Sequence, residues 1–377
     1  MYRILLIAAA AGALFAVAVA SAAFAQSAEE TAAWLNDIGA KHNGKPFTAD
    51  AVRTASLVSL QGVDFAKLKA ADVAKLSAMP QLYSITAADP RIGDDIVIAL
   101  ARLPNPRLTD FNLFRASITD AALAAMANHK TLASLGIEQT KVTAAGVKHL
   151  TTIKTLRTLR IGDTPIGDAG LEALQYMPAL RSLTLQSMKG VTRKGWAALG
   201  QLQNMESLNL QFAEINEDVE AIAAAPKLQD MTLMSSKLDD AGGQHLGKFK
   251  NMRRLFVWNT KITDKSMPAI GSLAELETIY LNGTGITDEG LKSLANLKKL
   301  RTLWLDRTAI TDAGMAHLTG LPALTWIRFE ETKVTDAGLL KLAELKTLTS
   351  VGVRKSAVTD DGIKKFNEIL PKARVSK

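Results

Sequence analysis

The stretch LETIYLNGTGITDEGLKSLANLKK, residues 276 to 299, decides the fold. Its opening LETIYL alternates apolar residues with period two, as a short strand does. A Thr-Asp pair follows, which offers an N-cap oxygen and an acid at the positive end of a helix, and the next residues, GLKSLANL, have helical spacing. One strand and one helix of this length cannot bury their apolar faces alone, so the stretch predicts neighbours of the same kind.

The pattern recurs through most of the chain. The branched apolar residue before Thr-Asp stands at positions 262, 286, 310, 334 and 358, always 24 residues apart. Nearly equal intervals extend the series backwards through Leu238, Ile215, Val191, Ile166, Val142 and Ile118, and less regularly through Ile92 and Leu68. About thirteen units of about 24 residues therefore fill residues 57–370. The segment LPNPRL between Ile92 and Ile118 holds extra residues and is expected to bulge as a loop.

Stacked units of this kind predict an α/β fold, a right-handed solenoid or horseshoe with a parallel sheet on the concave face and helices on the convex face. The unit LxxLxLxxTxITDxGLxxLxxLxx resembles the leucine-rich repeat family and is most similar to its cysteine-containing class, with Thr where Asn or Cys often stands. The resemblance implies a protein-binding scaffold rather than an enzyme. No F-box precedes the repeats, so a ubiquitin-ligase role is not carried over. The repeated Thr is expected to bond turn backbone between neighbouring units.

The two ends of the chain differ from the repeats. Residues 1–25 have a basic Arg3, an Ala-rich apolar run and the small-residue site Ala23-Phe24-Ala25, which predict a secretory signal peptide; an uncleaved membrane anchor is the alternative. Residues 26–56 are expected to cap the repeats with an amphipathic helix that buries Trp34, Leu35 and Ile38. After residue 370 we expect a Lys-rich tail, 371–377, with no further strand.

Composition agrees with an exported globular protein, periplasmic or extracellular. The chain of 377 residues is 47% hydrophobic and has no cysteine, so it forgoes disulfides and must be stabilised by packing. Its formal net charge of +8 is mild, and the basic residues are scattered among acids, so nucleic acid is not an expected partner. No later stretch could span a membrane, and we expect a monomer.

The repeat register identifies the surface that a partner could bind. In LxxLxLxx the Leu positions face the core, so the third, fifth, seventh and eighth positions face the concave side. Small polar residues dominate there in the early units, and aromatic and charged residues take over from Phe256 onward. The predicted partner-binding residues are Arg254, Phe256, Trp258, Tyr280, Asn282, Trp304, Asp306, Arg307, Trp326, Arg328, Glu330 and Glu331.

Other interpretations of this surface stay open. Phe256, Tyr280 and Trp304 could stack as a stabilising cross-strand ladder, which is compatible with binding. A protein partner is the first hypothesis, and a cell-envelope polysaccharide stacked on the rings is the second. Asp306 and Glu330 should be neighbours, and paired carboxylates beside aromatic rings could hydrolyse glycosides. Against that reaction, the side chains of Arg307, Arg328 and Arg354 are placed to neutralise both acids.

Neither a metal, a cofactor nor a catalytic residue is predicted. His149, His245 and His317 occupy equivalent helix positions three or four units apart, which is too far for one shared metal ion. The acids that recur at each helix start are explained by the helix dipole and by capping, without calcium. The sequence contains no HExxH, GxSxG or phosphate-cradling loop.

Overall fold

The structure is a computed structural model that describes residues 27–377. Residues 1–26, with the predicted signal peptide, lie outside the described residues. The chain divides into two compact units, Met1–Leu159 and Arg160–Lys377. Between residues 27 and 377, no helix has the length and apolar character needed to cross a bilayer.

The first unit starts with helical residues 27–37 and continues with parallel strands paired in chain order. Trp34, Leu35 and Ile38 are buried, as predicted for the capping helix. The strands are β1 (Leu57–Ser59), β2 (Ser84–Thr86), β3 (Asp110–Asn112), β4 (Ser134–Gly136) and β5 (Thr158–Arg160), which carries the boundary between units. The helices are α2 (Ala49–Thr54), the 3-10 helix η1 (Ala70–Ala78), α3 (Asp94–Ala101), α4 (Asp120–Met126) and α5 (Ala144–Leu150).

The second unit repeats the same alternation, and its strands β6 to β14 also pair in parallel and in chain order. The strands are β6 (Ser182–Thr184), β7 (Ser207–Asn209), β8 (Asp230–Thr232), β9 (Arg254–Phe256), β10 (Thr278–Tyr280), β11 (Thr302–Trp304), β12 (Trp326–Arg328), β13 (Ser350–Gly352) and β14 (Arg374–Ser376). The α-helices are α6 (Gly167–Leu174), α7 (Arg193–Gly200), α8 (Val219–Ile222), α9 (Asp240–Gly243), α10 (Met267–Gly271), α11 (Asp288–Leu291), α12 (Asp312–Met315), α13 (Asp336–Lys341) and α14 (Asp360–Ile369). Several continue into or follow short 3-10 helices, namely η2 (Leu246–Lys248), η3 (Asp264–Ser266), η4 (Lys292–Asn296), η5 (Ala316–Leu318) and η6 (Leu342–Glu344).

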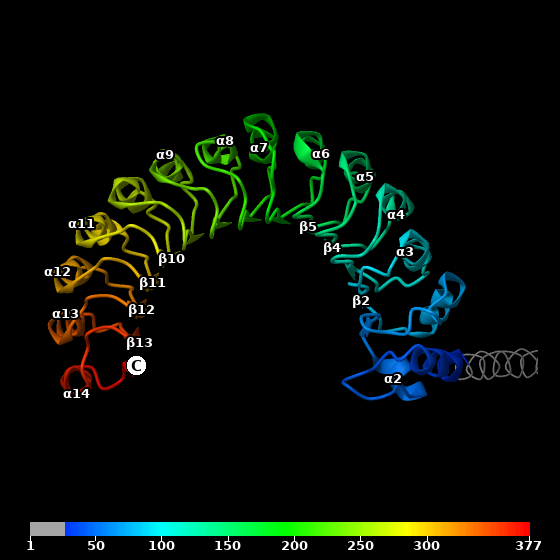
Figure 1. Cartoon of the computed structure of the whole chain (residues 1–377), viewed down its shortest axis with the longest axis horizontal. Coiled ribbons are helices and arrows are strands. Elements are labelled where there is room, and N and C mark those ends of the chain that lie inside the picture. The colour runs from blue at the N-terminus through cyan, green and yellow to red at the C-terminus, as the bar shows by residue number, and fades with distance from the viewer. Residues whose placement is uncertain (1–26) are drawn as a thin grey trace, which may run out of the picture. The chain divides into compact units, whose positions relative to one another are not determined.

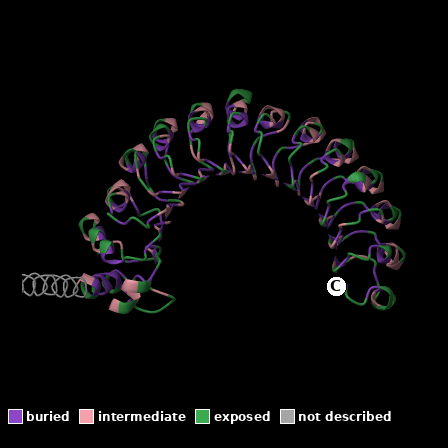
Figure 2. Ribbon diagram, turned by 180° about the vertical axis from the view of Figure 1, so that it is seen from behind, coloured by how far each residue is buried: buried purple, intermediate pink, exposed green. Residues whose placement is uncertain are grey.

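Within the second unit the strands lie on the concave side and the helices on the convex side (Figure 1). The middle residue of each strand from β6 to β13 is buried, as Ile279 is between Leu255 and Leu303 of the adjacent strands. The core fills the space between strands and helices, and the outer helix faces are exposed (Figure 2). The predicted repeating parallel α/β architecture is confirmed, and LPNPRL forms the predicted loop after α3.

A carboxylate links most repeats to the next. Asp288 Oδ1 accepts the backbone N–H of Thr311 at 2.8 Å, and its Oδ2 accepts the Thr311 hydroxyl at 2.6 Å. Thr311 is also the N-cap of α12, because its Oγ1 accepts from Ala313 N. The same Asp–Thr link recurs along both units, for example between Asp120 and Thr143. The N-cap role of Thr was predicted, whereas the link from Asp to the following repeat was not.

The glycine of TDxG makes room for this carboxylate. A Cβ placed on Gly314 would lie 2.3 Å from Asp288 Oδ1, and Gly290 and Gly338 meet the preceding Asp in the same way. The motif is therefore a clamp between repeats, in which the Gly of one unit receives the acid of the unit before it.

Two expectations were wrong. The repeated Thr after each strand bonds within its own unit: the Thr284 hydroxyl donates to Leu281 O and that of Thr308 to Leu305 O, three residues back in each case. The hydroxyl reaches this carbonyl because the residue before it has a positive φ, such as Arg307 at 53°. The chain also does not end without a strand, since β14 pairs with β13 and extends the sheet to Ser376.

Replacing Gly314 by Ala should lower the free energy of unfolding by about 1–3 kcal/mol, because the added methyl group displaces the Asp288 carboxylate from Thr311. Gly320→Ala is the matched control, since a Cβ there meets nothing within 4 Å, and it should change stability by less than about 1 kcal/mol. Urea denaturation followed by far-UV circular dichroism measures both. Equal losses in the two variants would contradict the clamp.

Candidate functional site

The parallel register brings three rings into one column on the concave side of the second unit. Tyr280 lies opposite Phe256 on one side and Trp304 on the other, because all three hold the fifth position of their repeats. Neighbouring strands are about 4.8 Å apart, which is close enough for aromatic side chains to stack. All three rings are half-buried.

The rings are packed against one another by their faces. The centroids of Tyr280 and Trp304 are 3.8 Å apart with an interplanar angle of 2°. Trp258 lies nearly parallel to Tyr280 at 5.5 Å, and Phe256 contacts both at an angle. The predicted cross-strand ladder is therefore present, and it includes Trp258.

Arg328 and Trp326 continue the column on β12. The Arg328 guanidinium carbon lies 4.3 Å from the Trp304 centroid, on a ring that already stacks with Tyr280. Trp326 meets Trp304 edge-on at 5.3 Å and is 39% exposed. In spatial order, the stack thus consists of Trp258, Tyr280, Trp304 and Arg328. The ring faces inside it are covered by neighbouring members of the stack.

Asp306 lies buried beneath this stack, at 5% exposure, and fixes it from below. Its Oδ2 pairs with Arg328 Nη2 at 2.7 Å and accepts from Asn282 Nδ2 at 2.5 Å. Its Oδ1 accepts the backbone N–H of Glu330 at 2.9 Å. The carboxylate is thus held by an ion pair, an amide side chain and a backbone group.

Burial raises the pKa of Asp306 above its ordinary value, although the backbone N–H of Glu330 and the charge of Arg328 both act to lower that pKa. Burial also raises the pKa of Tyr280. The low exposure of Asp306 and the half-burial of Tyr280 are the physical cause of both shifts, although their strands face the open side of the sheet.

Three polar atoms of the column remain unpaired. Asn282 Oδ1, Trp304 Nε1 and Arg328 Nε are buried and have no hydrogen-bond partner within residues 27–377. Trp34 Nε1 and Trp196 Nε1, outside the column, are also buried without a hydrogen-bond partner among residues 27–377, so this feature is not confined to the column.

The other predicted site residues have different surroundings. Arg254 forms a two-point ion pair with Asp230. Arg307 does not neutralise Asp306, since its Nη2 donates to Asn259 Oδ1 at 3.3 Å. Glu330 lies 3.4 Å from Arg328, and Glu331 lies 3.6 Å from Lys355.

Two of the predicted contacts are not surface residues. Asn282 and Asp306 are 8% and 5% exposed, so they support the rings rather than face a partner. The seventh position was expected to face solvent, and here it is covered because large side chains at neighbouring positions close over it. Arg354 was expected to neutralise the acids, but it forms no ion pair in the part of the chain described here.

Two apolar residues extend the ring column and were missed. Phe212 holds the eighth position of its repeat and is 50% exposed, with a φ of 59° that is unusual for a bulky residue. Its N–H donates to Met234 O at 3.0 Å, and Met234 lies opposite Trp258 by the register of β8 and β9. The eighth-position column would have revealed Phe212, because an aromatic residue there departs from the small or polar residues of most other units.

Phe212, Met234, Trp258, Tyr280, Trp304 and Trp326 together form what we call the oblique stripe. Its members hold the eighth, seventh, seventh, fifth, fifth and third positions of six consecutive repeats. The stripe therefore crosses the strands diagonally. The stripe spans five strand spacings of about 4.8 Å across the sheet and five residues of about 3.3 Å along the strands. Its diagonal length is therefore roughly 29 Å.

The paired-carboxylate hypothesis finds no support in this geometry. A glycosidase acid or base needs an available carboxyl group, whereas both oxygens of Asp306 are engaged by Arg328, Asn282 and the backbone. No group of three or more potential metal ligands occurs among residues 27–377.

Replacing Arg328 by Met should lower the free energy of unfolding at pH 7 by about 2 kcal/mol, because Asp306 is left buried without its counter-ion. The loss should be smaller near pH 4. Without Arg328 the folded-state pKa of Asp306 rises further above its unfolded value of about 3.9, and a raised folded pKa favours the folded state as the pH falls through it. Urea denaturation at the two pH values measures the difference.

Arg254→Met is the control for this experiment, because its ion pair with Asp230 involves an exposed guanidinium. Arg254→Met should lower the free energy of unfolding by less than about 1 kcal/mol at pH 7, and this loss should not become markedly smaller near pH 4. A loss in Arg328→Met that is equal at both pH values would show that Asp306 does not depend on this partner.

Comparisons with known proteins agree with the repeat architecture. Residues 152–174 and 275–295 match a family model described as Leucine Rich repeat. The fold is similar to that of an internalin from Listeria monocytogenes, with a TM-score of 0.53 and 17% identity over 92% of this chain and 93% of that chain. A leucine-rich repeat protein from Leptospira interrogans gives a TM-score of 0.49 and 14% identity over 80% and 92%. No curated protein matches the sequence. The chain thus has the fold of a leucine-rich repeat solenoid, and two of its segments match the leucine-rich repeat model.

Proposed function

We propose that this chain is an exported, non-enzymatic scaffold that binds a protein partner through the concave side of its second unit. The observation that carries the proposal is the oblique stripe, a row of partly exposed apolar side chains on six consecutive repeats, in which Trp258, Tyr280, Trp304 and Trp326 are in ring contact. Leucine-rich repeat domains generally mediate protein–protein interaction. Exposed apolar rows with polar surroundings are typical of interaction sites, and Trp, Tyr and Arg are the commonest energetic anchors.

The stacking geometry favours protein over polysaccharide. Sugars bind aromatic residues by lying on free ring faces, but Tyr280 is covered by Trp258 and Trp304, and Trp304 by Tyr280 and Arg328. The stack therefore exposes mainly ring edges to a partner. Ring edges can contact the side chains and backbone carbonyl groups of a protein. The length of roughly 29 Å fits an extended peptide segment of roughly nine residues.

We infer export and the class of repeat from the sequence. Export rests on the signal-peptide pattern of residues 1–25. We assign the repeats to the cysteine-containing class because ITDxGL recurs with its register intact and a Thr holds the Cys or Asn position. A monomer is in keeping with a scaffold that presents its own concave surface.

Replacing Trp258 and Trp326 together by Ala should weaken partner binding at least about tenfold, because both rings are partly exposed ends of the stack. The partner is first captured from the native cell envelope and identified, and its affinity for each variant is then measured by calorimetry. Tyr176→Ala is the matched control, since Tyr176 is 65% exposed just beyond the end of α6 and outside the stripe.

Unchanged affinity in the Trp258, Trp326 double variant would place the binding site elsewhere. If the intact protein captures no protein but is retained on insoluble cell-wall polysaccharide, and the same double variant is not, the polysaccharide hypothesis holds instead. Circular dichroism confirms that each variant is folded.

Export predicts that the mature protein begins at Gln26, because cleavage should follow Ala23-Phe24-Ala25. Intact mass spectrometry of protein recovered outside the cytoplasm measures the N-terminus. A mass that still includes residues 1–25, in protein held by the membrane, would indicate the uncleaved anchor.

A further inference from the structure

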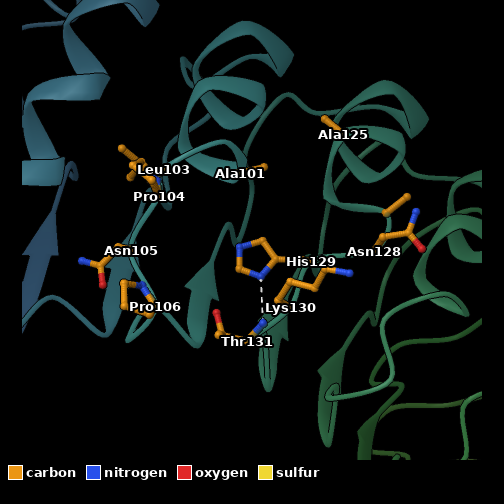
Figure 3. Close-up of a pocket in the computed structure, with 11 residues that line it drawn as sticks. Ala101, Leu103, Pro104, Asn105, Pro106, Ala125, Asn128, His129, Lys130 and Thr131 are labelled. Carbon is orange, nitrogen blue, oxygen red and sulfur yellow. Dashed lines mark hydrogen bonds between the residues drawn. The ribbon is translucent and has the colours of Figure 1, made fainter.

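A second candidate site lies in the first unit, where the repeat is irregular. The interval from Ile92 to Ile118 is 26 residues rather than 24, and the extra residues form the loop between α3 and β3. A pocket of about 620 Å³ opens between this loop and the turn that follows α4 (Figure 3). It is lined by Ala101, Leu103, Pro104, Asn105, Pro106, Ala125, Ala127, Asn128, His129, Lys130 and Thr131.

One wall of the pocket is held rigidly by the loop itself. Pro104 and Pro106 restrict the backbone on both sides of Asn105. The Asn105 side chain is 9% exposed; its Nδ2 donates to Met79 O at 3.0 Å, and its Oδ1 accepts from Arg107 N at 2.9 Å. The loop is thereby fastened to the preceding repeat and does not depend on a ligand for its shape.

The opposite wall is the turn that carries His129. Its Nδ1 accepts the backbone N–H groups of Thr131 at 3.4 Å and Leu132 at 3.2 Å, and its ring meets Phe111 edge-on at 6.1 Å. The Thr131 hydroxyl donates to Leu108 O at 2.6 Å, which ties this turn to the opposite loop. Both walls are therefore preformed.

The bonds at His129 define what it can offer a ligand. Because Nδ1 accepts hydrogen bonds, the neutral imidazole carries its proton on Nε2. Burial lowers the pKa of His129, which keeps the ring neutral near pH 7. Nε2 has no hydrogen-bond partner within the described chain, and Figure 3 shows this nitrogen turned toward the wall of Leu103 and Pro104.

The lining is apolar at one end and positive at the other. Ala101 and Ala125 lie at the ends of α3 and α4, on the side away from Thr131 (Figure 3). Lys130 is exposed beside His129, and the lining contains no Asp or Glu. The helix carboxyl ends disfavour an anion at the apolar end, so a negative group belongs at the His129 end.

We propose that this pocket binds a small molecule with an apolar body and a single carboxylate. A carboxylate oxygen accepts from His129 Nε2 with the Lys130 ammonium at the mouth, and the apolar body packs between the Pro104 loop and Ala125. The volume lies within the range of small-molecule sites, and an apolar cleft with few oriented polar groups is their usual construction. The site is separate from the oblique stripe and does not depend on the function proposed for it.

Three probe molecules of equal size separate the contribution of the carboxylate to binding from that of the apolar body. Benzoate, acetophenone and cumene have the same number of non-hydrogen atoms and differ in carrying a carboxylate, a carbonyl oxygen or no acceptor. We expect saturable binding of benzoate to the intact protein with a Kd of about a millimolar, as suits so small a ligand. Acetophenone should bind about tenfold more weakly and cumene more weakly again. Backbone and imidazole ¹⁵N chemical shifts measure the binding and locate it.

Substitutions assign the roles. His129→Asn keeps an acceptor for the amides of Thr131 and Leu132 but removes the Nε2 donor, and it should weaken benzoate binding about tenfold. Lys130→Gln should weaken it several-fold, whereas Lys148→Gln, at an exposed position on α5, is the matched charge control and should not. Ala125→Leu fills the apolar end and should abolish binding of all three probes.

The proposal is overturned if benzoate shows no saturable binding at about 10 mM, or if acetophenone or cumene binds as tightly as benzoate. It is also overturned if binding survives in Ala125→Leu or is unchanged in His129→Asn. Thermal unfolding of each variant establishes that a loss of binding is not a loss of folding.

Discussion

Hydrogen bonds from most repeats to the carboxylate of the repeat before them are the constraint on which the rest of the structure depends. Asp264 holds both the backbone and the hydroxyl of Thr287, and Gly290 leaves the space that its carboxylate needs. The link survives small changes of spacing, since Asp168 holds Thr192 and Asp94 holds Thr119 where the repeat is one or two residues longer. The clamp therefore fixes how neighbouring repeats meet, and the burial of leucines repeats that arrangement along the chain.

A constant period has a consequence for the surface. Equivalent positions of successive repeats lie opposite one another on parallel strands, so side chains of one kind at one position become a column in space. Rings at the fifth position stack, and Arg328 and Asp306 complete the stack from the side and from below. The result is a rigid surface whose side chains lose little conformational freedom when a partner binds.

The one markedly irregular interval has the opposite effect. Two additional residues lengthen the loop after α3, and the pocket lies between this loop and the neighbouring turn. The loop stays ordered because Asn105 and two prolines fasten it to the preceding repeat. The regular repeats thus carry the extended surface, and the irregular one lines the pocket of about 620 Å³.

The periodic features of the chain could be predicted from its sequence. The alternation of LxxLxL, the Thr N-caps and the fixed interval define strands, helices, core residues and the ladder of Phe256, Tyr280 and Trp304, because these depend on local chemistry and register alone. Only the tertiary structure decided that Asp306 and Asn282 are buried and that Arg328 rather than Arg307 neutralises the acid. These outcomes depend on which long side chain reaches which neighbour across strands, and that choice is made by packing and desolvation in three dimensions, for which a repeat pattern holds no information.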